Sequence, residues 1–140
     1  MKVMVIVKAT RDSEAGVMPS EELLTRMGQF NEDLVKAGVL LAGDGLHPSA
    51  KGVRVSFPSG AVTNGPFPET GQLISGFWLW RVQSMQEAID WIRRSPFQDF
   101  DESEVEIRPV FEADDFGEAL TPELRAQEAR ILAEANRNQA

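Results

Sequence analysis

Apolar residues occur in short runs that predict β-strands, and in two of these runs both alternating faces are apolar. Residues 2–8 and 77–82 therefore indicate central strands that are covered on each side. Residues 105–109 alternate between apolar and polar and end in a proline, which indicates a strand end or an edge strand with one wet face. The pattern also predicts a strand over residues 39–43 and a hairpin of residues 53–57 and 61–63.

Two segments have apolar residues at helical spacing. The first begins at Ser20, which is suited to cap a helix, and ends at Gly38. The second begins with Ser84 and Glu87, which form a capping box, and ends before Pro96. One apolar stripe on the first helix predicts that it covers a sheet. This stripe consists of Leu23, Met27, Phe30 and Leu34.

The chain beyond residue 111 differs in composition. Residues 112–120 are acidic and predict a linker, and Thr121 followed by Pro122 predicts the start of a last helix. The apolar stripe of that helix is thin, so we expect it to need the protein body or a partner for firm attachment. We therefore divide the chain into an α+β domain, residues 1–111, and an acidic linker with a C-terminal helix, residues 112–140.

The order of these elements predicts a ferredoxin-like α+β fold, βαββαβ with an extra hairpin. Its antiparallel sheet is backed on one face by two helices. The other face needs a cover, because Trp78, Trp80 and the second side of residues 2–8 supply more apolar surface than a solvent-facing sheet carries. We expect a homodimer whose two sheets pack face to face. The alternative is that the C-terminal helix of the same chain covers this face.

A loop rich in conformationally restricted residues, Asn64 to Thr70, follows the hairpin. Asn64 and Gly65 tolerate positive φ, and two prolines fix the backbone around Phe67. Such a loop loses little entropy on binding, so it could line a pocket or seal an interface. It could equally be a rigid crossover whose Phe67 fills a core. The candidate ligand-binding residues are Asn64, Gly65, Pro66, Phe67 and Glu69.

Composition limits the functions open to this chain. With 140 residues and a hydrophobic share of 42%, it suits one domain with one core. The 14 Lys and Arg against 22 Asp and Glu give a net charge of −8, which repels nucleic acids and anionic membranes. The chain has no Cys and one His, which excludes disulfides, iron–sulfur clusters, thiol catalysis and the usual metal sites. We therefore expect a cytoplasmic protein without a cofactor and without nucleic-acid or membrane partners. Residues 2–8, the longest apolar strand run near the start, are too short to span a bilayer.

Several of these motifs together resemble one family. They are the hairpin followed by Val62-Thr63-Asn64-Gly65-Pro66-Phe67 and Glu69, then Gly76-Phe77, Glu87-Ala88 and Val105-Glu106-Ile107-Arg108-Pro109, with Gly43-Asp44-Gly45-Leu46-His47-Pro48 as a further likeness. From residue 1 to about 111, the chain resembles the YCII-related family, in the branch named for its DGPF motif. The resemblance implies a dimeric α+β barrel with a cleft between sheet and helices, where related folds bind small ring compounds.

Two positions depart from the family pattern. Asn64 stands where the motif has Asp, so a carboxylate role there is lost while the turn is kept. Members thought to act as lyases or dehydrochlorinases on aromatic compounds carry a His in the first helix, paired with an Asp. The first helix here contains no His, so that pair cannot be carried over.

Three residues are candidates for acid–base chemistry. His47, three residues after Asp44 on a bent strand end, could form a pair in which the carboxylate orients the imidazole. The alternative is a solvated or capping His beside Pro48. Glu69 could act as a buried base, or it could cap a backbone amide.

The sequence leaves three kinds of function open, and it does not decide whether the protein is an enzyme. The first is a small-molecule-binding or sensing homodimer. The second is a lyase or isomerase that moves a proton on a small ring or carbonyl compound, with His47 or Glu69 as base. The third is an adaptor in a regulatory, transcription-related complex, which the acidic tail and the last helix suggest.

Overall fold

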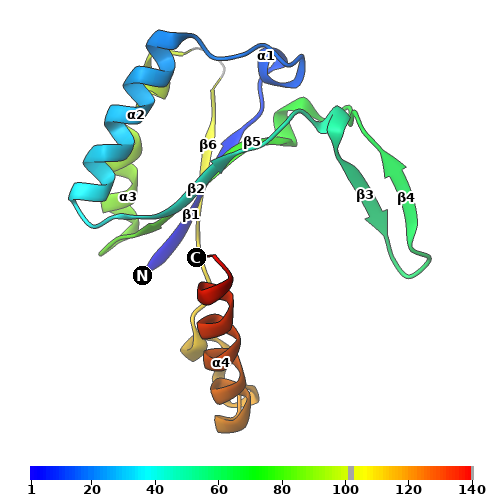
Figure 1. The fold of residues 1–140 in the computed structure, drawn as a ribbon, viewed down its shortest axis with the longest axis vertical. Helices are drawn as coiled ribbons and strands as arrows, with labels where there is room; N and C mark the ends of the chain where they lie inside the picture. Colours follow the sequence, from blue (N-terminus) through cyan, green and yellow to red (C-terminus); the bar gives the residue numbers. More distant parts are fainter. Residues whose placement is uncertain (101–102, 140) are drawn as a thin grey trace. The chain divides into compact units, whose positions relative to one another are not determined.

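The computed structural model describes residues 1–100 and 103–139, which form two compact units (Figure 1). Unit 1 extends from Met1 to Pro109, and unit 2 begins at Val110. The strands and helices of unit 1 are β1 (Lys2–Lys8), α1 (Arg11–Glu14), α2 (Glu21–Lys36), β2 (Leu40–Gly45), β3 (Val53–Ser56), β4 (Ala61–Asn64), β5 (Ile74–Arg81), α3 (Met85–Ile92) and β6 (Val105–Pro109). Three short 3-10 helices join them, η1 (Ser49–Lys51), η2 (Thr70–Gln72) and η3 (Pro96–Asp99). Unit 2 contains η4 (Ala113–Ala119) and α4 (Pro122–Asn138).

The main sheet of unit 1 has four strands in the order β2-β5-β1-β6. Every neighbouring pair in it is antiparallel. Figure 1 shows α2 and α3 on one face of this sheet. The predicted α+β class and antiparallel sheet are therefore confirmed, and residues 2–8 and 77–82 do supply the two central strands.

The core lies between this sheet and the two helices. Val3 and Val5 of β1 pair with Trp80 and Trp78 of β5, so these four side chains share the face that α2 and α3 cover. Phe30 of α2 packs edge-on against Trp78, with ring centroids 5.7 Å apart. The other members of the core cluster are Val7, Leu34, Val39, Val82 and Ala88.

Trp78 and Trp80 were expected on the uncovered face of the sheet, and this expectation is wrong. Trp78 is 7% exposed and Trp80 is 0% exposed, and both lie under the helices. Because β5 is apolar on both faces, its alternation could not show which face the helices would cover. The opposite face, called the second face below, instead carries Met4, Ile6, Phe77 and Leu79, whose positions alternate with the core residues.

Both principal helices begin at the predicted caps. The Ser20 side chain accepts a hydrogen bond from the Leu23 N–H at 3.1 Å, and the Ser84 side chain accepts one from the Glu87 N–H at 3.1 Å. Gly38 follows α2 with a φ of 74°, in the left-handed region that favours glycine. The short helix α1 was not predicted. It forms because Thr10 and Ser13 cap each other across one turn.

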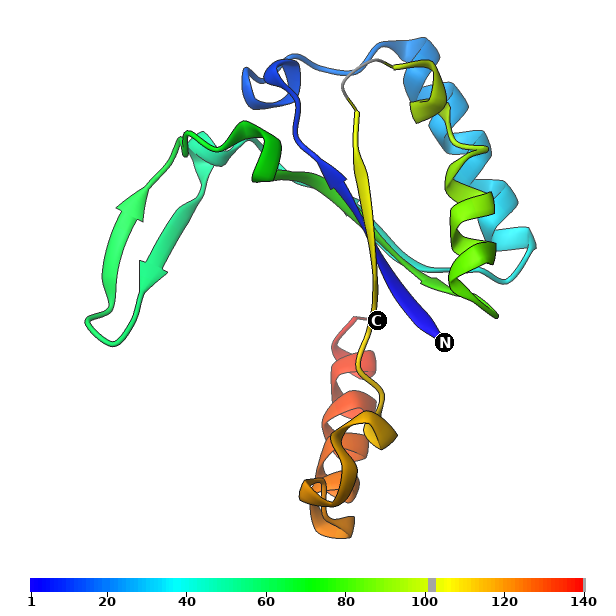
Figure 2. The ribbon, with the colours of Figure 1, turned by 180° about the vertical axis from the view of Figure 1, so that it is seen from behind.

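The hairpin β3–β4 forms a separate two-stranded sheet, called the arm below and comprising residues 53–64. Figure 1 shows it leaving the main sheet on the side away from α2 and α3, and Figure 2 shows the same arrangement from behind. Its turn places Gly60 at a φ of 75°. Asn64 was expected in a turn. It is instead the last residue of β4 and pairs with Val53, because the ladder continues to that position.

Unit 2 is a helical segment with its own internal contacts. Residues 112–120 were expected to be a plain linker, but they contain the 3-10 helix η4, and the rings of Phe111 and Phe116 stack 5.0 Å apart. The predicted last helix is confirmed as α4. Its cap is Thr121, which accepts a hydrogen bond from the Leu124 N–H at 3.2 Å. Among the residues described, no helix combines the length and the apolar character needed to cross a membrane.

Candidate functional site

A cavity of about 470 Å³ lies between the main sheet and the helical layer of unit 1. The core strand β1 supplies one lining residue, α2 supplies two, and η3 supplies Phe97 from the far wall. Backbone and side chains of β2 and β5 form the remainder. The lining residues are Val7, Met27, Asn31, Leu40, Gly43, Asp44, Gly45, Ser75, Gly76, Phe77, Trp78 and Phe97.

Asn31 is the polar side chain that α2 contributes to this cavity. Its Oδ1 accepts a hydrogen bond from the Trp78 Nε1–H at 2.9 Å, which orients both the carboxamide and the indole. The carboxamide nitrogen has no hydrogen-bond partner among the described residues, so its N–H groups are available as donors. Trp78 and Phe97 meet edge to face with ring centroids 6.1 Å apart, and they give the cavity an aromatic wall.

Two glycines allow the strands to approach closely at the cavity floor. A Cβ on Gly43 would lie 2.7 Å from Cδ1 of Trp78, and a Cβ on Gly76 would lie 3.1 Å from the backbone oxygen of Asp44. Gly43 therefore leaves room for the Trp78 indole, and Gly76 leaves room for the backbone of β2. The strand β2 runs on to Gly45, and its irregularity falls between Leu40 and Ala42 rather than at the glycines.

The lining has little ionisable chemistry. Asp44 is the ionisable residue among those that line the cavity, and its side chain shares the second face with Phe77, its partner on β5. Ser75 lies close to the backbone oxygens of Val7 and Lys8, with its Oγ 3.4 and 3.3 Å away. Within residues 1–100 and 103–139, no three His, Cys, Asp or Glu side chains gather as a metal site requires. The cavity can hold a ring compound against Trp78 and Phe97 and donate a hydrogen bond from Asn31 to a polar atom of that compound.

A profile of the YCII-related domain matches residues 1–114. The chain belongs to the YCII-related family. No curated protein matches it. Among solved structures, a similar chain is the 5-chloro-2-hydroxyhydroquinone dehydrochlorinase of Burkholderia phenoliruptrix AC1100, in complex with 2,5-dihydroxybenzoquinone. It is 16% identical, with a TM-score of 0.44 over 80% of this chain and 96% of that one, and nothing about function follows from a likeness of this extent.

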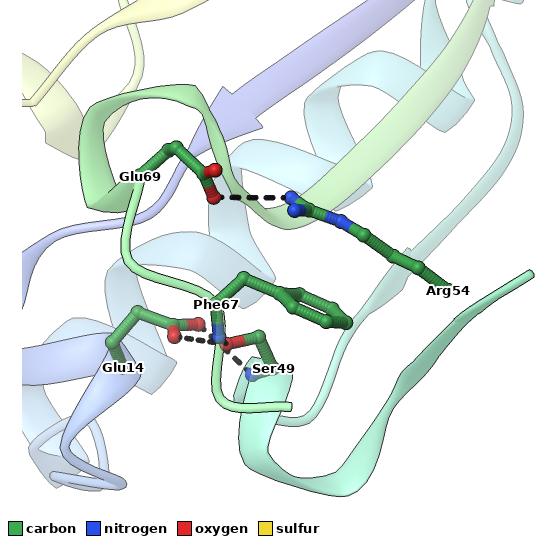
Figure 3. A network of polar contacts seen from close by, with 5 residues as sticks. All are labelled: Glu14, Ser49, Arg54, Phe67 and Glu69. Atoms are coloured by element: carbon green, nitrogen blue, oxygen red, sulfur yellow. Dashed lines mark hydrogen bonds and ion pairs between the residues drawn. The ribbon is translucent and has the colours of Figure 1, made fainter. Parts of the chain in front are cut away.

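The loop of residues 64–70, which was predicted to bind a ligand, is hydrogen-bonded to η1 and, through Ser49, to α1 of this YCII-related domain (Figure 3). The Phe67 N–H donates to the Oγ of Ser49 at 3.0 Å, and Ser49 donates in turn to the carboxylate of Glu14. Gly65 is needed for close approach, because a Cβ there would lie 1.8 Å from the backbone oxygen of Ser49. Gly65 does not adopt the positive φ that its sequence neighbours suggested.

Glu69 is held by Arg54 at the base of the arm. The Arg54 guanidinium lies 3.9 Å from the Phe67 ring centroid and 3.3 Å from Oε2 of Glu69 (Figure 3). The pKa of Glu69 is lowered from its ordinary value of 4.5, first by a hydrogen bond from its own backbone N–H and then by the one from Arg54. A lowered pKa makes this carboxylate a weaker base.

The structure does not bring the predicted site residues together. Asp44 and His47 are both exposed, and no hydrogen bond joins them in the described part of the chain. Of the predicted residues, only Asp44 is among those that line the cavity. A role in ligand binding for Asn64, Gly65, Pro66, Phe67 and Glu69 remains a prediction.

Two lining residues, Asn31 and Phe97, were not predicted as site residues, and only Asn31 has a sequence signal that could have identified it. Asn31 follows Met27 by four residues, so it lies on the helix face that carries the apolar stripe. A polar residue in such a stripe is a usable signal for a site. Phe97 gave no comparable signal, because only the packing of η3 brings it back to the sheet.

Proposed function

We propose that this YCII-related protein, as a member of the DGPF-motif branch, is a homodimer that binds or senses a small ring compound. The site is the cavity between the main sheet and α2. The observation that carries the proposal is the cavity itself, about 470 Å³ with Trp78 and Phe97 as walls and the Asn31 carboxamide aimed by an indole. This size and this mixture of aromatic walls with few polar groups are typical of small-molecule sites.

The same lining supports binding ahead of catalysis. A carboxamide neither gains nor loses a proton near neutral pH, so Asn31 can recognise an acceptor without transferring a proton to it. Glu69, a candidate base, has a lowered pKa and is not among the lining residues. A compound that fits this cavity should therefore bind and remain chemically unchanged.

The second face supports the homodimer. Its centre holds Met4, Phe77 and Leu79, which are only partly shielded or exposed. Charged residues surround this centre: Arg81 pairs with Lys2 at one end, Lys8 lies at the other end, and Arg108, Glu106 and Asp44 lie beside Met4, Ile6 and Phe77. Two copies packed face to face would remove these apolar centres from water.

The binding proposal is tested by calorimetric titration with a panel of phenols, quinones and aromatic ketones, followed by chromatography of each compound after incubation. We expect saturable binding by at least one compound, and recovery of that compound unchanged. Asn31→Ala should weaken binding by about 3- to 10-fold, the worth of one hydrogen bond. Gln29→Ala, on an exposed part of the same helix, is the matched control and should leave binding unchanged. Absence of binding, or steady conversion of a compound, would overturn the proposal.

A further inference from the structure

The Asn31 carboxamide offers the cavity a hydrogen-bond donor with a fixed direction. An indole N–H can only donate, so the carboxamide oxygen faces Trp78, at 2.9 Å from Nε1. The carboxamide nitrogen has no hydrogen-bond partner among the described residues, and Asn31 is one of the lining residues. A ligand that leaves this donor unpaired loses the free energy of a hydrogen bond. The cavity therefore favours a ligand that brings an acceptor atom.

The cavity offers no positive charge to an anionic ligand. Among the residues that the structure describes, none of those that line the cavity is a Lys, an Arg or a His. An anion that enters such a cavity loses its hydration and gains no opposite charge in return. Asp44, the ionisable lining residue, is acidic, and the net charge of the chain is −8, so the electric field of the protein also disfavours an anion.

The two cationic residues that are adjacent in sequence to lining residues are already paired. The Nζ of Lys8, on β1, lies 3.4 Å from Oε1 of Glu106. Arg26, on α2, forms an ion pair with Asp99. Neither cation can neutralise an anionic ligand without giving up its carboxylate partner. The ligand is therefore expected to be uncharged.

The rest of the lining fits the flat body of a ring. Trp78 and Phe97 form an aromatic wall, and Val7, Met27 and Leu40 are apolar. On such a ring a carbonyl oxygen suits the Asn31 donor, because it has two lone pairs and no proton of its own. A hydroxyl brings a proton as well, and the carboxamide oxygen that could accept it is already bound to the Trp78 indole.

We infer that the ligand of this cavity is an uncharged ring compound whose carbonyl oxygen accepts a hydrogen bond from the Asn31 carboxamide. Aryl ketones, quinones and aromatic lactones belong to this class, whereas aromatic carboxylates and phenolates do not. The inference rests on the binding role proposed above and names the class of ligand for the same site. It makes Asn31 the residue that determines which compounds of suitable shape are bound.

Three naphthalenes of nearly equal shape, substituted at the same ring carbon, test this. Methyl naphthyl ketone carries an uncharged carbonyl, isopropenylnaphthalene has a CH₂ group in place of the oxygen, and naphthoate is an anion at neutral pH. Calorimetric titration of the full chain gives each affinity, and the Trp78 indole N–H signal in NMR reports whether the compound occupies the cavity. We expect the ketone to bind there, and naphthoate to bind at least about 10-fold more weakly than the ketone.

Two charge-matched variants isolate the contribution of Asn31. Asn31→Asp keeps an oxygen that accepts from the Trp78 indole and replaces the donor with a second oxygen of the same size. The ratio of the ketone's affinity to the hydrocarbon's should then fall by at least about 3-fold, the worth of one hydrogen bond. Gln29→Glu adds the same charge on an exposed part of the same helix, and it should leave that ratio unchanged. Because both ligands meet the same variant, a general loss of stability cancels in the ratio.

The possible results separate this inference from the binding role. Ketone binding at Trp78, weak naphthoate binding and a ratio that falls only in Asn31→Asp support it. Naphthoate that binds as tightly as the ketone overturns the choice of an uncharged ligand, while binding in the cavity stands. A ratio that Asn31→Asp leaves unchanged, or that Gln29→Glu lowers equally, overturns the role of Asn31. Failure of the ketone to bind overturns the inference, and the binding role falls with it only if the wider panel of ring compounds also fails.

Discussion

Glu14 accepts two hydrogen bonds from Ser49, one from the backbone N–H at 3.0 Å and one from Oγ at 2.5 Å. Ser49 Oγ is also the acceptor for the Phe67 N–H. This one hydroxyl therefore joins the end of α1, the start of η1 and the loop that closes the arm. The residues come from three distant parts of the sequence, and together they fix the loop around Phe67.

Removing this hydroxyl should destabilise unit 1. Ser49→Ala leaves the Phe67 N–H without its acceptor and Glu14 with one donor fewer, which should cost about 1–3 kcal/mol of the free energy of unfolding. Urea denaturation followed by tryptophan fluorescence measures it. Ser56→Ala, on the exposed arm, is the control and should change stability by less than about 0.5 kcal/mol. Equal effects of the two substitutions would show that the Ser49 contacts contribute nothing.

Gly65 should tolerate no side chain. An added Cβ would lie 1.8 Å from the Ser49 backbone oxygen, so Gly65→Ala must displace the loop or η1. We expect a loss of about 3 kcal/mol or more in the free energy of unfolding, at the upper end for overpacking. Gly71→Ala is the matched control, because a Cβ there meets no atom within 4 Å. A Gly65→Ala protein as stable as Gly71→Ala would contradict the close approach.

Much of the fold follows from local sequence signals. Ser20 and Ser84 mark both helix starts, since a capping side chain acts on backbone groups within one turn. The side of Trp78 and Trp80 did not follow, because β5 is apolar on both faces and only the packed helices decide between them. Asn64 was misjudged because the Asn-Gly pair favours a turn, while the β3–β4 ladder continues through Asn64.

The site was harder to predict than the fold. The cavity is lined by residues of β1, α2, β2, β5 and η3, and sequence spacing does not show that these elements enclose a space. Asn31 could have been predicted as a site residue from the sequence, because it is a polar residue at helical spacing in an apolar stripe. The residues around Phe67 are conformationally restricted, and the structure shows them in contact with Ser49, while their role in ligand binding stays a prediction.

Glu69 should titrate below the usual range for a glutamate. Its pKa lies below 4.5 in the folded chain, so the stabilisation from this carboxylate is present above pH 4.5 and is lost as the pH falls through the folded pKa. NMR titration of the Glu69 carboxyl carbon gives the midpoint. In Arg54→Gln the midpoint should rise and still stay below 4.5, because the backbone N–H is the larger cause. A midpoint at or above 4.5 in the wild type would contradict the contacts drawn in Figure 3.

Gly43 at the cavity floor gives a further prediction, with a control at a glycine outside the cavity. Gly43→Ala would place a Cβ 2.7 Å from Cδ1 of Trp78 and push the indole, so ligand affinity should fall. Gly71 does not line the cavity and a Cβ there meets no atom within 4 Å, so Gly71→Ala should leave affinity unchanged. Calorimetric titration with the compound that binds the wild type compares the two. Equal affinities for the two variants would place the ligand away from Trp78.

The most direct test of ligand binding in the cavity is an NMR titration of the indole N–H signals. Trp78 lines the cavity, whereas Trp80 and Trp91 do not. The Trp78 signal therefore reports on the cavity, and the signals of Trp80 and Trp91 serve as internal controls. We expect a bound ring compound to shift the Trp78 signal saturably and much more than the other two, with the compound unchanged afterwards. Shifts of equal size in all three signals, or none at saturating compound, would contradict the proposed site.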